Sequence, residues 1–104
     1  MIDVRSVKLK VENIVATANL FTHLDLDKVM TALQNPNLGE SFATLRYNPK
    51  EFPGIIYHPY RSGIALLIFS SGKLVVTGAR SFDDIQVAVS KLVKVLSKIG
   101  VEFT

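Results

Sequence analysis

The sequence of 104 residues contains no cysteine, and this absence excludes disulfide bonds, thiolate zinc sites and a cysteine nucleophile. It also has no apolar run near the roughly 18 residues that a membrane-spanning helix needs. The first residues, Met1 to Arg5, lack the basic and then apolar pattern of a secretory signal. We therefore expect a soluble intracellular protein with no membrane partner, and the start at Met1 and finish at Thr104 favour a complete reading frame.

Charged residues make up only 20% of the chain, whereas hydrophobic residues make up 48%. These proportions exclude a disordered tail, and the length favours a single domain over residues 1–104. A chain of this size can bury roughly two thirds of the surface that its unfolded form exposes, so association with a second copy would increase its stability. The net charge of +3 permits a polyanionic partner without demanding one.

The chain also has little that could catalyse a reaction. Its two histidines, His23 and His58, stand apart in the sequence from any metal-ligand cluster or triad partner. Several aspartates lie where helices are expected to begin, and there a carboxylate favours the positive end of the helix dipole. These aspartates are Asp25, Asp27, Asp83 and Asp84. We therefore expect neither an enzyme nor a cofactor.

The spacing of apolar residues predicts two helices. The first covers residues 26–33, with Asp25 as its N-cap, and a turn cluster at residues 35–39 ends it. The second follows Ser81, which occupies capping-box positions together with Asp84, and a glycine stops it. Its apolar positions are Ile85, Ala88, Val89, Leu92, Leu96 and Ile99.

Alternating and β-branched segments predict five strands. The first strand is long, and the four that follow are short and separated by breaks that suit hairpins. The expected strands cover residues 7–18, 42–47, 55–58, 64–70 and 74–77. An antiparallel meander of the last four strands is the simplest arrangement, which predicts an α+β fold.

The last two strands are apolar on both faces, although two helices can cover only one face of such a sheet. The residues expected to pack on the helices are Leu66, Ile68, Leu74 and Val76. The opposite face would then present an apolar surface edged with small polar groups. This surface consists of Leu67, Phe69, Val75 and Thr77, together with Asn13, Val15 and Thr17.

An exposed apolar patch of this kind marks an interaction site, because leaving it in water costs about 25 cal/mol per Å². One explanation is a second subunit that covers the patch with its own core. The minor groove of DNA suits the patch better, because its floor offers sugars and base edges to apolar side chains. Its acceptors also suit Asn and Thr, and its base steps admit wedges such as Phe.

Three segments of the chain resemble one repeat of the TATA-box-binding protein family. They are residues 12–17 (Glu-Asn-Ile-Val-Ala-Thr), residues 47–57 and residues 66–79, and the resemblance extends over residues 7–100. Two such repeats in tandem form the family's core, a saddle of ten antiparallel strands astride an A/T-rich minor groove. The resemblance therefore implies half a saddle, a curved five-stranded antiparallel sheet with two helices on its convex face.

The resemblance also implies a set of DNA contacts. These are hydrogen bonds from Asn13 and Thr77, apolar contacts from Val15, Leu67 and Val75, intercalation by Phe52 and Phe69, and a phosphate contact from Lys73. Without the resemblance, a strand phenylalanine is usually a core residue, and the loop phenylalanine could simply fasten its loop.

A single repeat supplies one phenylalanine pair and half of the contact area, so an isolated copy should bind DNA poorly. The first strand is expected at an open sheet edge, and we predict a two-fold homodimer through residues 7–11 that restores the saddle. Such a dimer would bind and bend A/T-rich DNA in transcription initiation. We expect this in the cytoplasm, at the nucleoid of a prokaryote, or in the nucleus of a eukaryote.

Two other interpretations stay open. The chain could be a protein-interaction module, or an accessory nucleic-acid-binding domain of the same fold that does not recognise TATA elements. In the family the helix side recruits general transcription initiation factors. A stripe of lysines on the last predicted helix could contribute to such a surface, although the ordinary explanation for these lysines is a solvated helix face. The stripe consists of Lys91, Lys94 and Lys98. Lys50 departs from the acidic loop that contacts the family's B-type initiation factor.

Overall fold

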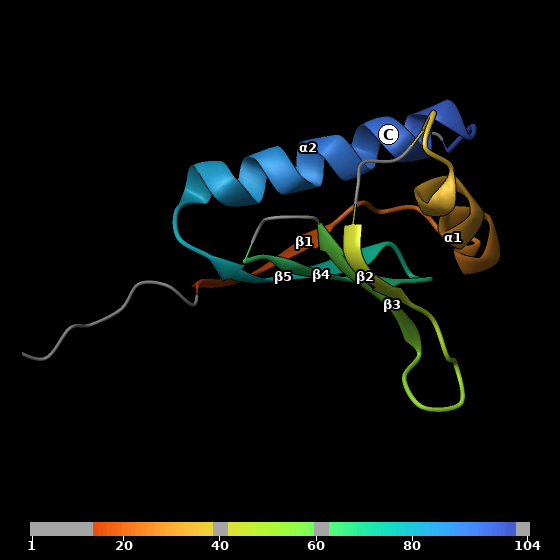
Figure 1. Ribbon diagram of the computed structural model, residues 1–104, viewed down its shortest axis with the longest axis horizontal. Helices are drawn as coiled ribbons and strands as arrows, with labels where there is room; N and C mark the ends of the chain where they lie inside the picture. The colour runs from red at the N-terminus through yellow and green to blue at the C-terminus, as the bar shows by residue number, and fades with distance from the viewer. Residues whose placement is uncertain (1–13, 39–41, 60–62, 102–104) are drawn as a thin grey trace, which may run out of the picture.

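The computed structural model describes residues 14–38, 42–59 and 63–101, which form two layers, a five-stranded sheet and two helices (Figure 1). Along the chain the elements are β1 (Ile14–Asn19), α1 (Leu26–Gln34), β2 (Phe42–Arg46), β3 (Gly54–Pro59), β4 (Ala65–Phe69), β5 (Lys73–Ala79) and α2 (Phe82–Lys98). Both helices lie on the same side of the sheet (Figure 1). The predicted α+β class is confirmed.

The strands follow one another in an antiparallel meander from β2 to β5, and β1 pairs with the free side of β5. The resulting order, β1-β5-β4-β3-β2, places β1 at one edge of the sheet, as predicted for the first strand. The sequence predicts this strand over residues 7–18, and the structure ends it at Asn19. Residues 7–13, which include the expected dimer contact, lie outside the described residues.

Helix α1 begins where a side chain can satisfy its free backbone donors. The Asp25 carboxylate accepts hydrogen bonds from the backbone N–H groups of Asp27, at 3.1 Å, and Lys28, at 3.4 Å, so the predicted N-cap is confirmed. The helix ends at Gln34 because the residue before Pro36 is driven into an extended conformation. Its buried residues are Leu26, Val29, Ala32 and Leu33.

Helix α2 is capped at both ends. The Ser81 hydroxyl accepts a hydrogen bond from the Asp84 backbone N–H at 3.2 Å, which is one half of the predicted capping box. In the other half the Asp84 carboxylate would accept from the backbone N–H of Ser81. It accepts instead from the backbone N–H of Arg80. At the far end Gly100 has a φ of +89°. Hydrogen bonds from Gly100 to the Ser97 carbonyl and from Val101 to the Leu96 carbonyl complete a Schellman motif.

The core lies between the sheet and the helices. The strand residues predicted to face the helices are all at most 1% exposed, namely Leu66, Ile68, Leu74 and Val76. The predicted stripe of α2 missed Val95, which is 4% exposed and lies three residues after Leu92 on the same helix face. Within the described ranges, neither helix is long and apolar enough to cross a membrane.

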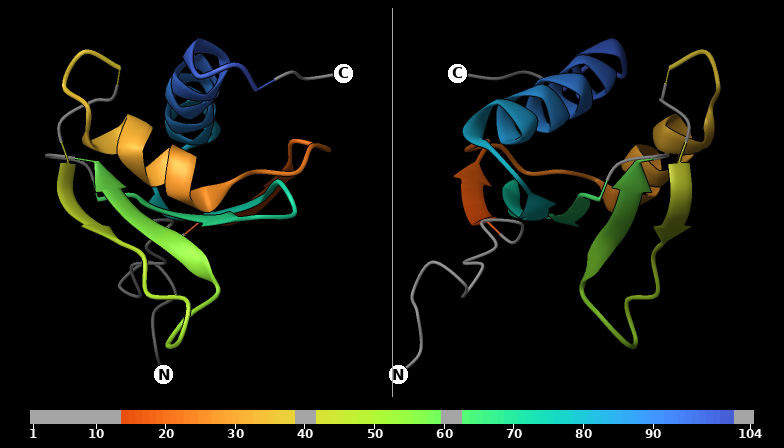
Figure 2. Two further views of the ribbon diagram at one scale, coloured as in Figure 1. Left: turned by 90° about the vertical axis from the view of Figure 1, so that its right-hand side faces the viewer. Right: turned by 60° about the vertical axis from the view of Figure 1, so that its left-hand side comes forward.

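The sheet is bent, and the β2–β3 hairpin drops away from the side that carries the helices (Figure 2). One local cause is a bulge in β5, where two residues, Thr77 and Gly78, lie opposite the single residue Val15. Gly78 has a φ of +78°, and a Cβ there would overlap the carbonyl oxygen of Gly63. The helices therefore cover the convex side of the sheet, and none of the described elements covers its concave side.

Candidate nucleic-acid interface

We call the sheet face that points away from the helices the open face. Cross-strand pairing places five of its residues in one row across all five strands, namely Arg46, Ile56, Leu67, Val75 and Thr17. Residues two positions away on each strand point to the same face. The centre of the open face is therefore apolar, with one polar or charged residue at each end of the row.

Burial separates the open face from the core face. Leu67, Phe69, Val75 and Thr77 are only half-buried, although each lies next to a fully buried neighbour, and Val15 is 64% exposed. The predicted assignment of these residues to the face away from the helices is confirmed, whereas their roles towards DNA stay predictions. Asn13 lies outside the described residues.

The two phenylalanines that the resemblance assigns to intercalation lie together. The ring centroids of Phe52 and Phe69 are 5.6 Å apart, with an edge-to-face angle of 61°, a favoured aromatic arrangement. Gly54, opposite Phe69 in the sheet, lies against both rings, because a Cβ there would be 3.1 Å from Phe52 and 3.2 Å from Phe69. The pair therefore has a fixed position at one end of the open face.

The loop before β3 holds Phe52 in this position. The Asn48 carbonyl accepts hydrogen bonds from the backbone N–H groups of Glu51, at 3.0 Å, and Phe52, at 2.9 Å. The Asn48 side-chain oxygen accepts a third from the backbone N–H of Lys50 at 3.2 Å. An ion pair of 3.8 Å joins Arg46 to Glu51, but both side chains are about two thirds exposed, so this pair contributes little stability.

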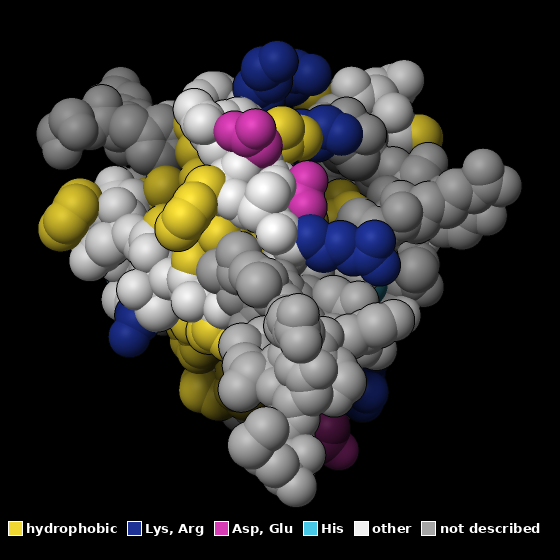
Figure 3. All heavy atoms as spheres, turned by 90° about the vertical axis from the view of Figure 1, so that its left-hand side faces the viewer, with side chains coloured by type: hydrophobic (Ala, Val, Ile, Leu, Met, Phe, Trp, Pro, Cys, Tyr) yellow, Lys and Arg dark blue, Asp and Glu magenta, His cyan; other side chains and the backbone are white. Residues whose placement is uncertain are grey.

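Charge is distributed unequally between the two layers. The described strands carry Arg46, His58 and Lys73 and no carboxylate. By contrast, the helices and their caps carry both signs, and Figure 3 shows acidic and basic side chains together at the end of the molecule where α2 begins. The described strands therefore carry a small excess of basic residues, which suits an anionic partner.

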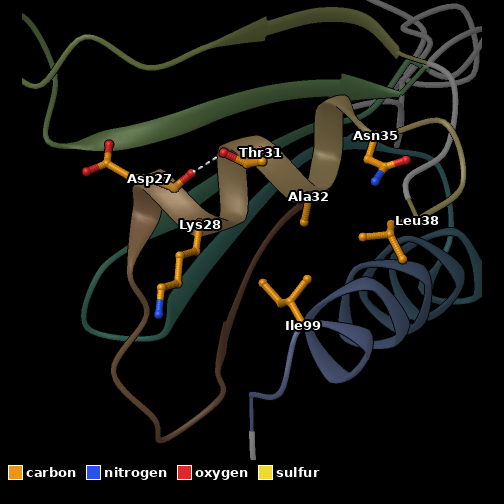
Figure 4. Close-up of a pocket in the computed structure, with 7 residues that line it drawn as sticks. All are labelled: Asp27, Lys28, Thr31, Ala32, Asn35, Leu38 and Ile99. Atoms are coloured by element: carbon orange, nitrogen blue, oxygen red, sulfur yellow. Dashed lines mark hydrogen bonds between the residues drawn. The ribbon is translucent and has the colours of Figure 1, made fainter.

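A second surface lies on the opposite side of the molecule. Between α1 and the end of α2 there is a pocket whose apolar side chains, Ala32, Leu38 and Ile99, converge (Figure 4). Lys28 and Asp27 contribute polar groups to its lining. The predicted lysine stripe of α2 is also exposed on the helix layer. In the part of the chain that the structure describes, no group of three or more His, Asp or Glu residues could hold a metal ion.

Sequence reasoning missed three residues of the open face. Ile56 completes its apolar centre, Arg46 ends its central row, and Gly54 supports the aromatic pair. Alternation within β3, from buried Ile55 to half-buried Ile56, could have revealed the first. The other two depend on the register between β2, β3 and β4, which is set by the geometry of the turns between these strands and was not assigned from the sequence.

Comparisons with known proteins agree with this geometry. The sequence profile of the family described as "Transcription factor TFIID (or TATA-binding protein, TBP)" matches residues 8–99. The TATA-box-binding protein of Thermococcus kodakarensis is 54% identical over 104 residues, which are 100% of this chain and 50% of that protein. That of Pyrococcus furiosus is 53% identical over 103 residues, or 99% of this chain and 49% of that protein.

A solved structure supports the same assignment. The structure named Methanococcus jannaschii TBP matches with a TM-score of 0.69 and 31% sequence identity, over 84% of this chain and 46% of that chain. The chain thus spans about half the length of the relatives that it matches. Sequence profile, relatives and fold all agree over most of the chain, and this chain belongs to the TATA-binding protein family.

Proposed function

We propose that two copies of this chain bind and bend A/T-rich double-stranded DNA through its minor groove, in the initiation of transcription. The observation that carries this proposal is the pair of Phe52 and Phe69 at one end of a concave apolar face. The names of the relatives, TATA-box-binding proteins, support the same partner. The charged residues of the described strands are basic, which favours a polyanionic partner such as DNA.

The aromatic pair would act as a wedge. Inserting an apolar side chain between base pairs costs a few kcal/mol of unstacking, and the bent duplex offsets this cost by touching more protein surface. Both rings are half-buried, so each keeps an exposed portion for a base step. Pyrimidine–purine steps such as TA unstack at low cost, and they would be preferred at the wedge.

The centre of the open face would meet the groove floor. Ile56, Leu67 and Val75 form a continuous apolar strip that tolerates the flat edges of A·T pairs. A G·C pair adds the guanine amino group to the floor, and an apolar strip leaves that donor without a partner. The proposed preference for A/T-rich DNA follows from the unpaired guanine amino group in G·C pairs and from the greater flexibility of TA steps in the DNA.

One copy provides a single wedge and half of a saddle. A kink at each end of a short site needs two wedges, so we propose that a second copy pairs with the first through residues 7–11. The position of β1 at the sheet edge supports this arrangement, because an edge strand leaves backbone groups available for antiparallel pairing.

A bandshift titration with a TATA-containing duplex tests the wedge. We expect the double variant Phe52→Ala/Phe69→Ala to lose about tenfold or more in affinity and to lose the bend, because the wedge is gone. Phe82→Ala is the matched control, since Phe82 is 78% exposed on α2, on the helix side. Unchanged DNA binding by the double variant, with the control also unchanged, would reject the proposed interface.

A competition between duplexes separates the proposal from its alternatives. A/T-rich DNA should compete better than G/C-rich DNA, and both better than duplex RNA, whose minor groove is wide and shallow. Equal competition by all three would favour an accessory nucleic-acid-binding domain. No binding to any of them would favour a protein-interaction module.

The helix side provides an observation in favour of a second, compatible function. Its apolar pocket between α1 and α2 and its exposed lysines lie opposite the open face, so a protein bound there would leave the DNA contact free. We propose this side as the surface for other transcription initiation factors. Pull-down of such a factor by a preformed DNA complex is the direct test.

A further inference from the structure

The loop between β1 and α1 carries an aromatic residue that the proposed function has not used, Phe21. It is 78% exposed, and its backbone has a φ of +54°. Among the described residues it is the one residue other than glycine with a positive φ. A bulky residue in this left-handed region is strained, and an exposed ring gains nothing from burial. Within its own fold Phe21 therefore costs free energy without a visible return.

Hydrogen bonds hold this loop against the turn between β4 and β5, and the two lie side by side (Figure 2). The Gly72 carbonyl accepts from the backbone N–H of Leu20 at 2.9 Å, and the Ser70 carbonyl accepts from that of Leu24 at 2.8 Å. Between these bonds, Gly72 lies so close to the loop that a Cβ there would overlap the Thr22 carbonyl oxygen. The backbone that carries the exposed ring is therefore fixed relative to the turn.

The alternation of β1 places Phe21 on the side of the open face. Every second residue packs against the core, namely Ala16, Ala18 and Leu20. The residues between them are exposed, namely Val15, Thr17 and Asn19, and Thr17 belongs to the central row of the open face. Phe21 continues this exposed series, and its backbone N–H donates to the Asn19 side-chain oxygen at 2.8 Å.

We call residues 19–22 and 70–73 the rim. The polar side chains of the rim are an amide, three hydroxyls and one cation, namely Asn19, Thr22, Ser70, Ser71 and Lys73. Lys73 pairs with Asn19 in the sheet, so the cation lies two residues from the aromatic ring across the strand pair. The rim contains no carboxylate, and the next one along the loop, Asp25, caps α1. Lysine, hydroxyl and amide side chains are the usual contacts of DNA phosphates.

The rim begins beside the wedge. Its turn follows Phe69 directly, and the Phe69 carbonyl accepts a hydrogen bond from the Gly72 N–H at 3.0 Å. A duplex that is seated on the open face and opened at Phe69 therefore has one of its backbones next to the rim. That backbone offers phosphates, which suit Lys73 and the hydroxyls, and deoxyribose carbons, which suit an aromatic ring.

We infer that Phe21 is a further DNA contact, whose ring packs on a deoxyribose next to the phosphate that Lys73 binds. This inference rests on the proposed function and extends its interface from the groove floor to the sugar–phosphate backbone. The deoxyribose is the same in every nucleotide, so the contact adds affinity without sequence preference. Removal of the ring from water in the complex provides the return that the strained loop lacks in the free chain.

Bandshift titrations with an A/T-rich and a G/C-rich duplex test this contact. Asparagine tolerates a positive φ, so Phe21→Asn removes the ring and keeps the loop, and its melting temperature should be no lower than that of the natural chain. We expect it to bind both duplexes about fivefold more weakly, as when roughly 40 Å² of ring no longer leaves water. Phe21→Tyr keeps the ring and should bind like the natural chain. Phe82→Ala is the matched control, because Phe82 is equally exposed but lies on the helix side.

The salt dependence separates the ring from its neighbouring cation. The slope of log affinity against log salt should be the same for Phe21→Asn as for the natural chain, because no charge is removed. Lys73→Gln should lower the slope by roughly 0.9, the value for one phosphate contact. A change of slope in Phe21→Asn as large as that in Lys73→Gln would contradict an apolar contact.

A photoreactive side chain identifies what the ring touches, whatever the stability of the variants. The analogue p-benzoylphenylalanine in place of Phe21 should cross-link to DNA in the complex, and the same analogue in place of Phe82 should not. A cross-link from position 21 to a second copy of the chain and not to DNA would overturn the inference and assign the ring to the dimer. Absence of any cross-link in a complex that forms would overturn it as well.

Failure of this inference differs from failure of the proposed function. If the natural chain binds A/T-rich DNA and Phe21→Asn binds it equally well, the ring makes no contact while the DNA-binding function stands. A loss confined to the A/T-rich duplex would also contradict a backbone contact. If the natural chain binds neither duplex, the proposed function is rejected and the inference with it.

Discussion

Gly54 leaves room for the aromatic pair because it has no side chain. A Cβ at this position would lie 3.0 Å from the Ile68 carbonyl oxygen and only slightly farther from the Phe52 and Phe69 rings. Gly54→Ala therefore displaces the rings, and we expect a several-fold loss of DNA affinity. The free energy of unfolding should fall by about 1 kcal/mol, as for mild overpacking. Bandshift titration and urea denaturation measure these two effects.

Gly63→Ala provides the matched control for this substitution. A Cβ at Gly63 would have its nearest neighbour, the Gly78 carbonyl oxygen, at 3.7 Å, which is an ordinary contact distance. Neither DNA affinity nor stability should change appreciably. If Gly54→Ala is destabilised but binds DNA as tightly as the control, the position of the aromatic pair does not matter for binding.

At the scale of the element, a single substitution can remove the N-terminal cap of α2. The Ser81 hydroxyl accepts the Asp84 backbone N–H at 3.2 Å, and loss of such a cap costs about 1 kcal/mol. Ser81→Ala should lower the free energy of unfolding by this amount in a urea titration. Ser90→Ala, at an exposed position inside the same helix, should be neutral or slightly stabilising because alanine favours helix. Equal effects of the two substitutions would contradict the role of the cap.

The helices and strands were easier to predict from the sequence than the register in which the strands pair. Helical spacing and capping residues were sufficient for α1 and α2, since these signals lie within one turn of each other in the sequence. Alternation was sufficient to separate Leu67 and Val75 from the buried Leu66 and Val76. The alignment of Ile56 with Leu67 and the bulge opposite Val15 arise from pairing between strands. This pairing depends on the exact turn geometry, which the sequence analysis did not assign.

The candidate site shows the same division. Phe52 and Phe69 could be paired in advance only through the family resemblance, because seventeen positions separate them and their contact depends on the β3–β4 register. No functional role was predicted for His58, because its position in the sequence does not show on which face of the sheet it lies. The family is non-enzymatic, which agrees with the expectation drawn from the scarcity of catalytic groups.

At the scale of the whole molecule, one chain spans about half the length of its relatives, and among the described strands β1 lies at the edge of the sheet. A two-fold dimer through this edge would place two aromatic pairs at opposite ends of a single continuous surface. Because both halves would be identical, each would present the same residues to its half of the site. The proposed dimer therefore favours a palindromic A/T-rich site, bound equally well in either orientation.

Light scattering after size exclusion tests this arrangement. At micromolar concentration we expect twice the mass of one chain without DNA, and two chains per duplex in the complex. Leu9→Pro should yield a monomer with roughly tenfold or more weaker DNA binding, because proline removes a backbone donor from the proposed pairing of residues 7–11. Asp3→Pro, which lies before that segment, should remain a dimer. A natural chain that stays monomeric both free and on DNA would refute the dimer, since one wedge and half a saddle would then be enough for binding.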